Sequence, residues 1–229
     1  MIKIPQLEDM LKAGMHFGHR TNRWHPKMKP FIFTSKNGIY IINLKKTQEK
    51  LQEALEFMVR MIAEGKSVLF VGTKNQVSEP LKKMALAIDQ PYIVGKWLGG
   101  YLTNFAVVKK SVKKYLDLIE KRESGKLEKY TKKERLNFDR EIKKLEMRVG
   151  GLASLTKLPD ALFLWDIKEE ETAMKEAQQK NIPIIAICDT NVDPTPINYP
   201  IPANDDAIKT IKLLLDSIQE TILSEKKKS

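Results

Sequence analysis

Residues 67–73 read SVLFVGT, a short and almost wholly apolar run. Such a run is typical of a strand that is covered on both faces of a sheet. Two more runs of this kind follow, ALFLWDI at 161–167 and PIIAICDT at 183–190. PYIVGKW at 91–97 predicts a fourth, short strand. INYPIPA at 197–203 predicts an edge strand, because its prolines have no amide proton to donate to a neighbouring strand.

Segments with the apolar spacing of helices separate these strands. They cover residues 43–64, 77–88, 169–181 and 205–223. Strands that alternate with helices of this length build βαβ units, so the expected fold class is α/β. We expect a doubly wound, mainly parallel five-stranded sheet of the flavodoxin-like type, with helices on both faces.

The N-terminal region adds a smaller set of elements. Residues 4–13 have helical spacing, and residues 14–30 are rich in Gly, Pro, His and basic residues, which predicts a loop. FIFTSKNGIYIINL at 31–44 contains two β-rich runs around Asn37 and Gly38. Asn-Gly favours a tight hairpin turn, in which both central residues need a positive φ.

An insertion at residues 103–150 divides the sheet domain into residues 1–102 and 151–229. Its apolar residues recur at helical spacing on two segments, and Glu123–Lys126 supplies the break between them. Thr131 and Glu134 predict a capping box at the start of the second helix. The apolar seam is narrow and its surroundings are basic, so we expect an antiparallel coiled-coil helical hairpin that projects from the sheet domain.

Composition narrows the class of protein and its partners. The chain has 229 residues, one cysteine, Cys188, and a formal net charge of +11. One cysteine cannot form an intrachain disulfide, and no uncharged apolar run is long enough for a membrane helix, so a cytoplasmic protein with no membrane partner is expected. Residues 103–150 hold 15 Lys and Arg against 8 Asp and Glu, whereas residues 151–229 hold 9 against 13. A basic field of this size favours a nucleic-acid partner.

Few patterns in the sequence support an enzyme. VGTK at 71–74 follows a strand and precedes a helix, where α/β folds bind phosphate groups, but the chain lacks both GxGxxG and GxxxxGK[ST]. A nucleotide-binding α/β enzyme that uses this turn stays open as the alternative. Contact between Lys74 and an RNA phosphate is the preferred interpretation.

The sequence does not predict a metal site. His16, His19 and His25 have a spacing that could suggest zinc, but no cysteine or carboxylate lies in that stretch. Asp189, Asp193, Asp205 and Asp206 could hold magnesium, although loop and cap chemistry explains them better. We therefore expect no cofactor and no metal, and a structural or RNA-contacting role for the histidines.

Two stretches carry the features of an RNA surface. In GHRTNRWHPKMKPFIF at 18–33, four cationic side chains lie beside aromatic rings. Cations neutralise phosphates and flat rings stack on unpaired bases, although Trp24 and Phe31 could also anchor this stretch to the core. WLGGYLTN at 97–104 joins the sheet domain to the insertion and is predicted to be a hinge or a seat for RNA.

Several blocks of the sequence resemble the bacterial small-subunit ribosomal protein S-two family: AGMHFGHRTNRWHPKMKPFIF at 13–33, FVGTKNQ at 70–76, KWLGGYLTN at 96–104 and NIPIIAICDTNVDP at 181–194. The resemblance implies a doubly wound α/β domain with an inserted coiled-coil hairpin, and no enzymatic role or small-molecule substrate. It implies binding to small-subunit rRNA during assembly and contact with neighbouring ribosomal proteins, including the large S-one protein. The positions that match the family's basic, RNA-facing blocks are Arg20, Arg23, Lys27, Lys29, Lys74, Lys96, Lys109, Lys110 and Lys113. Together with His16, His19, Trp24 and Trp97 they form the predicted RNA-binding set.

Overall fold

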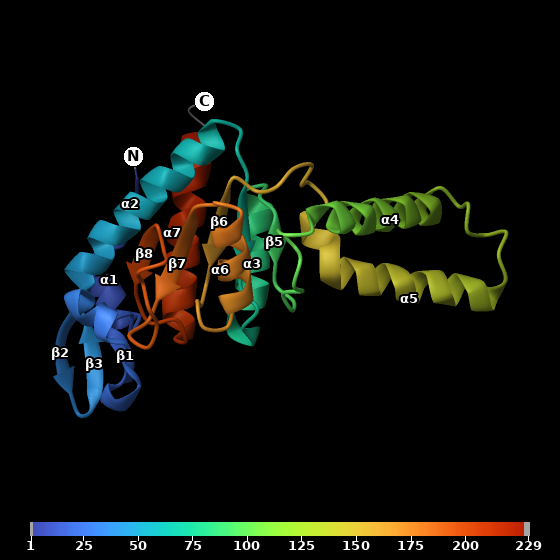
Figure 1. Cartoon of the computed structure of the whole chain (residues 1–229). Coiled ribbons are helices and arrows are strands. Elements are labelled where there is room, and N and C mark those ends of the chain that lie inside the picture. Colours follow the sequence, from blue (N-terminus) through green and yellow to red (C-terminus); the bar gives the residue numbers. More distant parts are fainter. Residues whose placement is uncertain (1, 227–229) are drawn as a thin grey trace.

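A five-stranded parallel sheet forms the centre of the molecule in the computed structural model, which describes residues 2–226 (Figure 1). The strands lie in the order β5-β4-β6-β7-β8. If the strands of this sheet are numbered from 1 to 5 along the chain, their order in the sheet is 2-1-3-4-5, which is the order of flavodoxin-like folds. The mixed α/β class and the five predicted strands are therefore confirmed. The strands are β4 (Val68–Val71), β5 (Tyr92–Ile93), β6 (Ala161–Leu164), β7 (Ile184–Cys188) and β8 (Tyr199–Pro202).

Side chains of the central strands alternate between two apolar cores. Phe70 and Phe163 pair across β4 and β6 and contribute to one core, and Leu69 and Leu162 pair next to them and contribute to the other. All four side chains are buried. Burial on both faces explains why these strands are apolar throughout rather than alternately polar.

Helices cover both faces of this sheet. The first core takes its helical side chains from α1 (Leu7–Lys12), α2 (Leu44–Ala63), α3 (Asn75–Ala87) and α7 (Ile208–Lys226). Buried alanines of α6 (Glu171–Gln179) contribute to the second core. The helix predicted over residues 4–13 is shorter in the structure, because Gln6 is its N-cap with an extended backbone and Ala13 is its C-cap.

A second, three-stranded antiparallel sheet lies at one end of the molecule in the order β1-β3-β2 (Figure 1). The predicted hairpin is confirmed: β2 (Ile32–Lys36) and β3 (Ile39–Ile42) flank a two-residue turn, in which Asn37 and Gly38 have φ values of 52° and 74°.

The prediction of a loop over residues 14–30 was wrong in part. This stretch contains β1 (Phe17–Arg20) and two 3₁₀ turns, η1 (Thr21–Arg23) and η2 (Pro26–Phe31). Strand β1 forms because it pairs with β3, a long-range partner that local sequence patterns do not reveal.

Two long helices, α4 (Phe105–Glu123) and α5 (Lys132–Val149), project together from the β5 edge of the central sheet, opposite the small sheet (Figure 1). We call these helices and their connection the rod. The capping box at the start of α5 is confirmed, since the Thr131 side chain accepts from the amide of Glu134 and the Glu134 carboxylate accepts from that of Thr131. At the base of the rod the chain continues through η3 (Gly150–Leu152) into β6. Within residues 2–226, no helix is long and apolar enough to cross a membrane.

Candidate nucleic-acid interface

The carboxyl end of β4 is where an α/β fold of this order would hold a ligand. Here the ammonium group of Lys74 lies 2.8 Å from Asp166, 3.0 Å from Asp205 and 2.7 Å from Asp206. We call these three carboxylates the acidic cluster. Burial alone would lower the pKa of Lys74, but hydrogen bonds from its ammonium to the acidic cluster raise it well above its ordinary value. Lys74 is therefore permanently charged and already paired, which makes it a poor ligand for an RNA phosphate.

The turn after β4 is also occupied by a side chain of the protein itself. The amide of Thr73 donates to the carboxylate of Glu170 over 2.8 Å, so the backbone donor that would bind a phosphate has a partner. Glu170 is buried, and burial raises the pKa of its carboxyl group. An anionic nucleotide at this turn would meet several carboxylates, which argues against the alternative of a nucleotide-using enzyme.

His19 lies on β1 and His16 lies just before it, and the two side chains have different surroundings. His19 Nδ1 lies 3.1 Å from a carboxylate oxygen of buried Asp189. That hydrogen bond raises the pKa of His19 above its ordinary value of 6.5, against the opposing effect of burial. His16 packs on the ring of Phe17 with 4.0 Å between ring centroids, and burial lowers its pKa. Across residues 2–226 no group of three His, Cys, Asp or Glu side chains is arranged to hold a metal ion.

The N-terminal basic segment, residues 20–29, presents its cations to solvent. Anchors hold its backbone: the amide of His25 donates to the carbonyl of Thr190 over 2.8 Å, Met28 is fully buried, and Trp24 packs on Tyr40 with 5.0 Å between ring centroids. The cationic side chains are exposed, and none has a carboxylate partner among the residues that the structure describes: Arg20, Arg23, Lys27 and Lys29. The segment thus offers four free cations on a fixed backbone.

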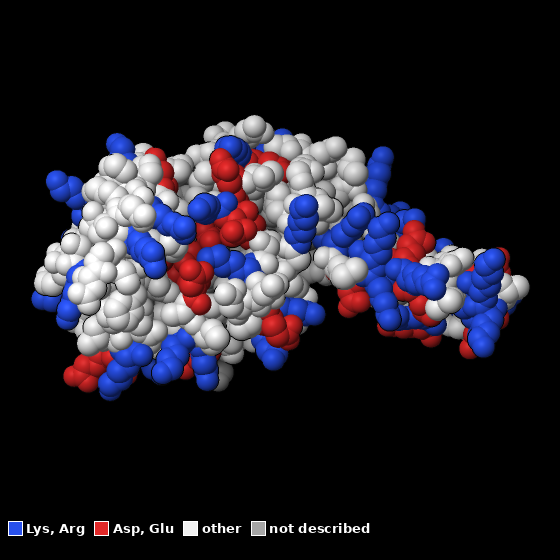
Figure 2. Space-filling view, turned by 90° about the horizontal axis from the view of Figure 1, so that it is seen from below, with Lys and Arg blue, Asp and Glu red and all other residues white. Residues whose placement is uncertain are grey.

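A second group of predicted cations lies on the rod and at its base. Lys109, Lys110 and Lys113 are exposed on α4, and Lys96 is exposed after β5. In the described part of the chain these four have no ion-pair partner, whereas neighbouring Lys114 pairs with Glu141. Figure 2 shows Lys and Arg along the rod with Asp and Glu between them, and a group of acidic side chains on the body.

The side chain of Trp97 is buried inside the protein and is not available to RNA. Its ring is buried, and its indole N–H donates to the carboxylate of Glu176 on α6. The same carboxylate accepts from the amides of Gly100, Leu102 and Thr103 and from the Thr103 hydroxyl. This arrangement holds the connection at 97–104 to the sheet domain at several points, which argues against a free hinge.

Three further exposed or half-exposed cations lie outside the predicted RNA-binding set. Lys144 and Arg148 lie on α5, and Lys82 lies on α3. Their side chains have no ion-pair partner within residues 2–226. The spacing of four between Lys144 and Arg148 places both on one face of the helix, and it could have indicated a joint role.

The chain matches the sequence model of a protein family described as Ribosomal protein S2 over residues 10–225. It belongs to this ribosomal protein S2 family. It is 47% identical over 220 residues to the small ribosomal subunit protein uS2 of Coprothermobacter proteolyticus, an alignment that covers 96% of this chain and 82% of that protein. It is 46% identical over 221 residues to the uS2 protein of Roseiflexus castenholzii, with 96% and 84% of the two chains covered. The S2 family consists of structural ribosomal proteins, so this member is not an enzyme.

Proposed function

We propose that this S2-family chain is a structural constituent of the cytoplasmic small ribosomal subunit, and that it binds small-subunit rRNA through two cationic surfaces. One surface is the N-terminal basic segment. The other is formed by Lys96 and the three rod lysines, Lys109, Lys110 and Lys113. The observation that carries the proposal is that all of these cations are exposed and free of carboxylate partners among the described residues. Cations that are not neutralised within the protein are available to phosphates.

The positions of the two surfaces support a bridging role. The small sheet, next to the N-terminal basic segment, and the rod lie at opposite ends of the molecule (Figure 1). A chain with this shape can contact RNA elements that are too far apart for one compact domain. Lys74 and Trp97 are omitted from the proposed RNA contacts, because each is held by partners within the protein.

The finer organisation of the chain is part of the proposal. Residues 103–150 would act as an inserted module beside a sheet domain of residues 1–102 and 151–229. We take α4 and α5 to pack as a two-stranded coiled coil. Support comes from the buried side chains along the facing sides of these helices, which are Val108, Val112, Tyr115, Leu118, Ile142 and Val149.

Neighbouring ribosomal proteins complete the proposed environment. The resemblance to the S-two family supports a role in assembly and in seating the large S-one protein. An exposed apolar surface supports a protein contact: Leu11 on α1 and Phe33 on β2 line a groove beside Leu44 with a volume of about 620 Å³.

Co-sedimentation tests the central proposal. A tagged copy of the full chain should travel with small subunits on a sucrose gradient, and salt should weaken its binding to small-subunit rRNA steeply, because each neutralised phosphate releases counterions. A chain that stays at the top of the gradient and ignores the rRNA at low salt would contradict the proposal.

A further inference from the structure

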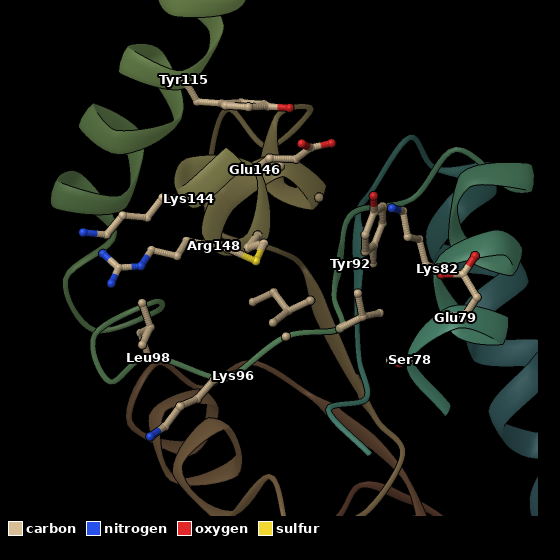
Figure 3. A pocket seen from close by; sticks show the side chains of 16 residues that line it. Ser78, Glu79, Lys82, Tyr92, Lys96, Leu98, Tyr115, Lys144, Glu146 and Arg148 are labelled. Carbon is tan, nitrogen blue, oxygen red and sulfur yellow. The ribbon is translucent and has the colours of Figure 1, made fainter. Parts of the chain in front are cut away.

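A cleft opens where the base of the rod meets the β5 edge of the central sheet (Figure 3). Its volume is about 640 Å³. One wall comes from α3 and the end of β5, and the other from the last turns of α5 with η3. None of the surfaces of the proposed function includes this cleft, apart from Lys96, which lies at its edge.

Glycines bring the two walls together. A Cβ atom on Gly151 would collide with the carbonyl oxygen of Tyr92, and a Cβ on Gly95 would lie 3.2 Å from the carbonyl oxygen of Met147. Backbone therefore lies directly against backbone at two places, so the base of the rod lies close to the sheet edge. Side chains larger than glycine at these two positions would push the walls of the cleft apart.

Cations line this cleft from three parts of the chain. Lys144 and Arg148 come from α5, Lys96 follows β5, and Lys82 comes from α3 (Figure 3). In residues 2–226 none of the four has an ion-pair partner. Two carboxylates also line the cleft, so the four cations leave it with a net positive charge. The two carboxylates belong to Glu79 and Glu146. Glu79 lies 3.7 Å from Lys83, which is outside the cleft, and Glu146 faces Tyr92 and Tyr115.

The cleft also contains flat and apolar surface. Tyr92 is half-buried and its ring stands in the cleft, while Tyr115 closes the upper end with its hydroxyl group (Figure 3). Met147 is 74% exposed, although it is a large apolar side chain. Aromatic rings next to free cations are the combination that holds single-stranded nucleic acid, since the ring stacks on a base and the cations bind the phosphates on either side.

We propose that this cleft binds an unpaired, looped-out nucleotide of RNA, with its base on Tyr92 and Met147 and its flanking phosphates on Lys96, Lys144 and Arg148. The inference rests on the proposed function and adds a third contact, at the base of the rod. Duplex RNA does not fit this arrangement, because stacked bases inside a helix cannot reach Tyr92 and only the phosphates could approach. An acidic peptide would use the cations but leave the ring without a role.

Photo-crosslinking identifies what occupies the cleft. The probe p-benzoylphenylalanine is placed at Met147 in the full chain, which is then incorporated into small subunits. Ile208 on α7 is the control position, because it is 73% exposed and lies in the acidic part of the chain. We expect crosslinks from position 147 to rRNA, at a nucleotide outside any helix, and none from position 208. Crosslinks from position 147 to a ribosomal protein, or to paired rRNA alone, would overturn the inference.

Binding measurements test the cations and the aromatic ring of the cleft separately. The triple variant Lys96→Glu, Lys144→Glu and Arg148→Glu should reduce the slope of log affinity against log salt for a short polyuridine strand by about 2, at about 0.7 per lost phosphate contact. Tyr92→Leu should weaken binding of that strand about tenfold, by loss of base stacking, and leave binding of a matched RNA duplex unchanged. Lys180→Glu, Lys209→Glu and Lys212→Glu together are the control, since they change the charge equally on α7 and at the end of α6.

The outcomes separate this inference from the proposed function. If the wild-type chain co-sediments with small subunits while the cleft variants bind polyuridine as the control does, the cleft inference fails and the function stands. If the wild-type chain binds no rRNA, the proposed function itself fails. Thermal melting shows whether Tyr92→Leu and Tyr92→Phe are folded. Tyr92→Phe keeps the stacking surface and should bind polyuridine as the wild type does, so weak binding by a folded Tyr92→Leu reports the loss of the ring.

Discussion

The indole N–H of Trp97 donates to the carboxylate of Glu176 over 3.1 Å, although the two residues lie 79 positions apart. Three backbone amides and one hydroxyl donate to the same carboxylate. Burial would raise the pKa of Glu176, but the hydrogen bonds from Thr103 and Gly100 lower it below its ordinary value. The ionised carboxylate of one α6 residue thus holds the connection between the sheet domain and the rod.

Replacing this carboxylate should destabilise the fold. Glu176→Ala leaves several buried donors without an acceptor, so we expect the free energy of unfolding to fall by about 3 kcal/mol, measured by urea denaturation. Glu171→Ala on the same helix is the control, because its pair with Lys175 is exposed and should contribute under about 0.5 kcal/mol. Equal stabilities of the two variants would show that the hydrogen bonds of Glu176 contribute little.

Charge reversal tests the N-terminal basic segment. Arg20→Glu, Arg23→Glu, Lys27→Glu and Lys29→Glu together should block incorporation into small subunits, and the slope of log affinity against log salt should fall by about 3 to 4. The domain should stay folded, since these side chains are exposed and the anchors of the segment, Trp24 and Met28, are retained. The control reverses four lysines of the acidic third of the chain, Lys175, Lys180, Lys209 and Lys212. Normal incorporation of the first variant would exclude the segment as a contact.

Removal of the rod tests its assignment to RNA. A short Gly-Ser linker in place of residues 107–148 should leave the body folded by circular dichroism, because both apolar cores keep the strands of the central sheet. Incorporation into small subunits should fall, since Lys109, Lys110 and Lys113 are lost. Intact binding to rRNA with loss of protein contacts alone would show that the rod binds protein instead.

The pair formed by His19 and Asp189 predicts a pH dependence of stability. The folded pKa of His19 lies above its ordinary value of 6.5. The protonated pair therefore stabilises the fold fully below pH 6.5, and this contribution is lost as the pH rises through the folded pKa. His19→Ala and Asp189→Asn should each flatten the dependence of the free energy of unfolding on pH over this window. A wild-type profile in both variants would contradict the assignment.

The exposed apolar groove near the small sheet yields a prediction about the S-one protein. Phe33→Asp should reduce capture of that protein by the full chain while stability changes by less than about 0.5 kcal/mol, because Phe33 is 73% exposed. Ile208→Asp changes an equally exposed side chain on α7 and should leave capture unaltered. Undiminished capture by the Phe33 variant would contradict the proposal that this groove binds the S-one protein.

Local patterns predicted the central sheet because burial on both faces makes each strand apolar, as in VLFV of β4 and IIAIC of β7. They also predicted the turn at Asn37 and Gly38, whose positive φ values restrict the residue types. Strand β1 was missed because FGHR is half exposed and is defined by its pairing with β3. Nothing local distinguishes it from a loop.

The candidate site was predictable only where side chains act alone. Exposed cations such as Arg20 and Lys109 are visible as a basic composition. The partners of Lys74 cannot be read from the sequence, because Asp166 and Asp205 lie far along the chain and come close to Lys74 only when the parallel strands align. The same holds for the cleft at the base of the rod, since Gly151 contacts Tyr92 across the whole insertion.

The hydrogen bond from the Thr73 amide to Glu170 has a consequence for regulation. In α/β folds this turn and the start of the helix after it are where phosphate groups bind to backbone amides. Here the side chain of Glu170 already takes the Thr73 amide that a phosphate would use. Cellular levels of ATP or GTP should therefore leave the conformation of this turn unaltered.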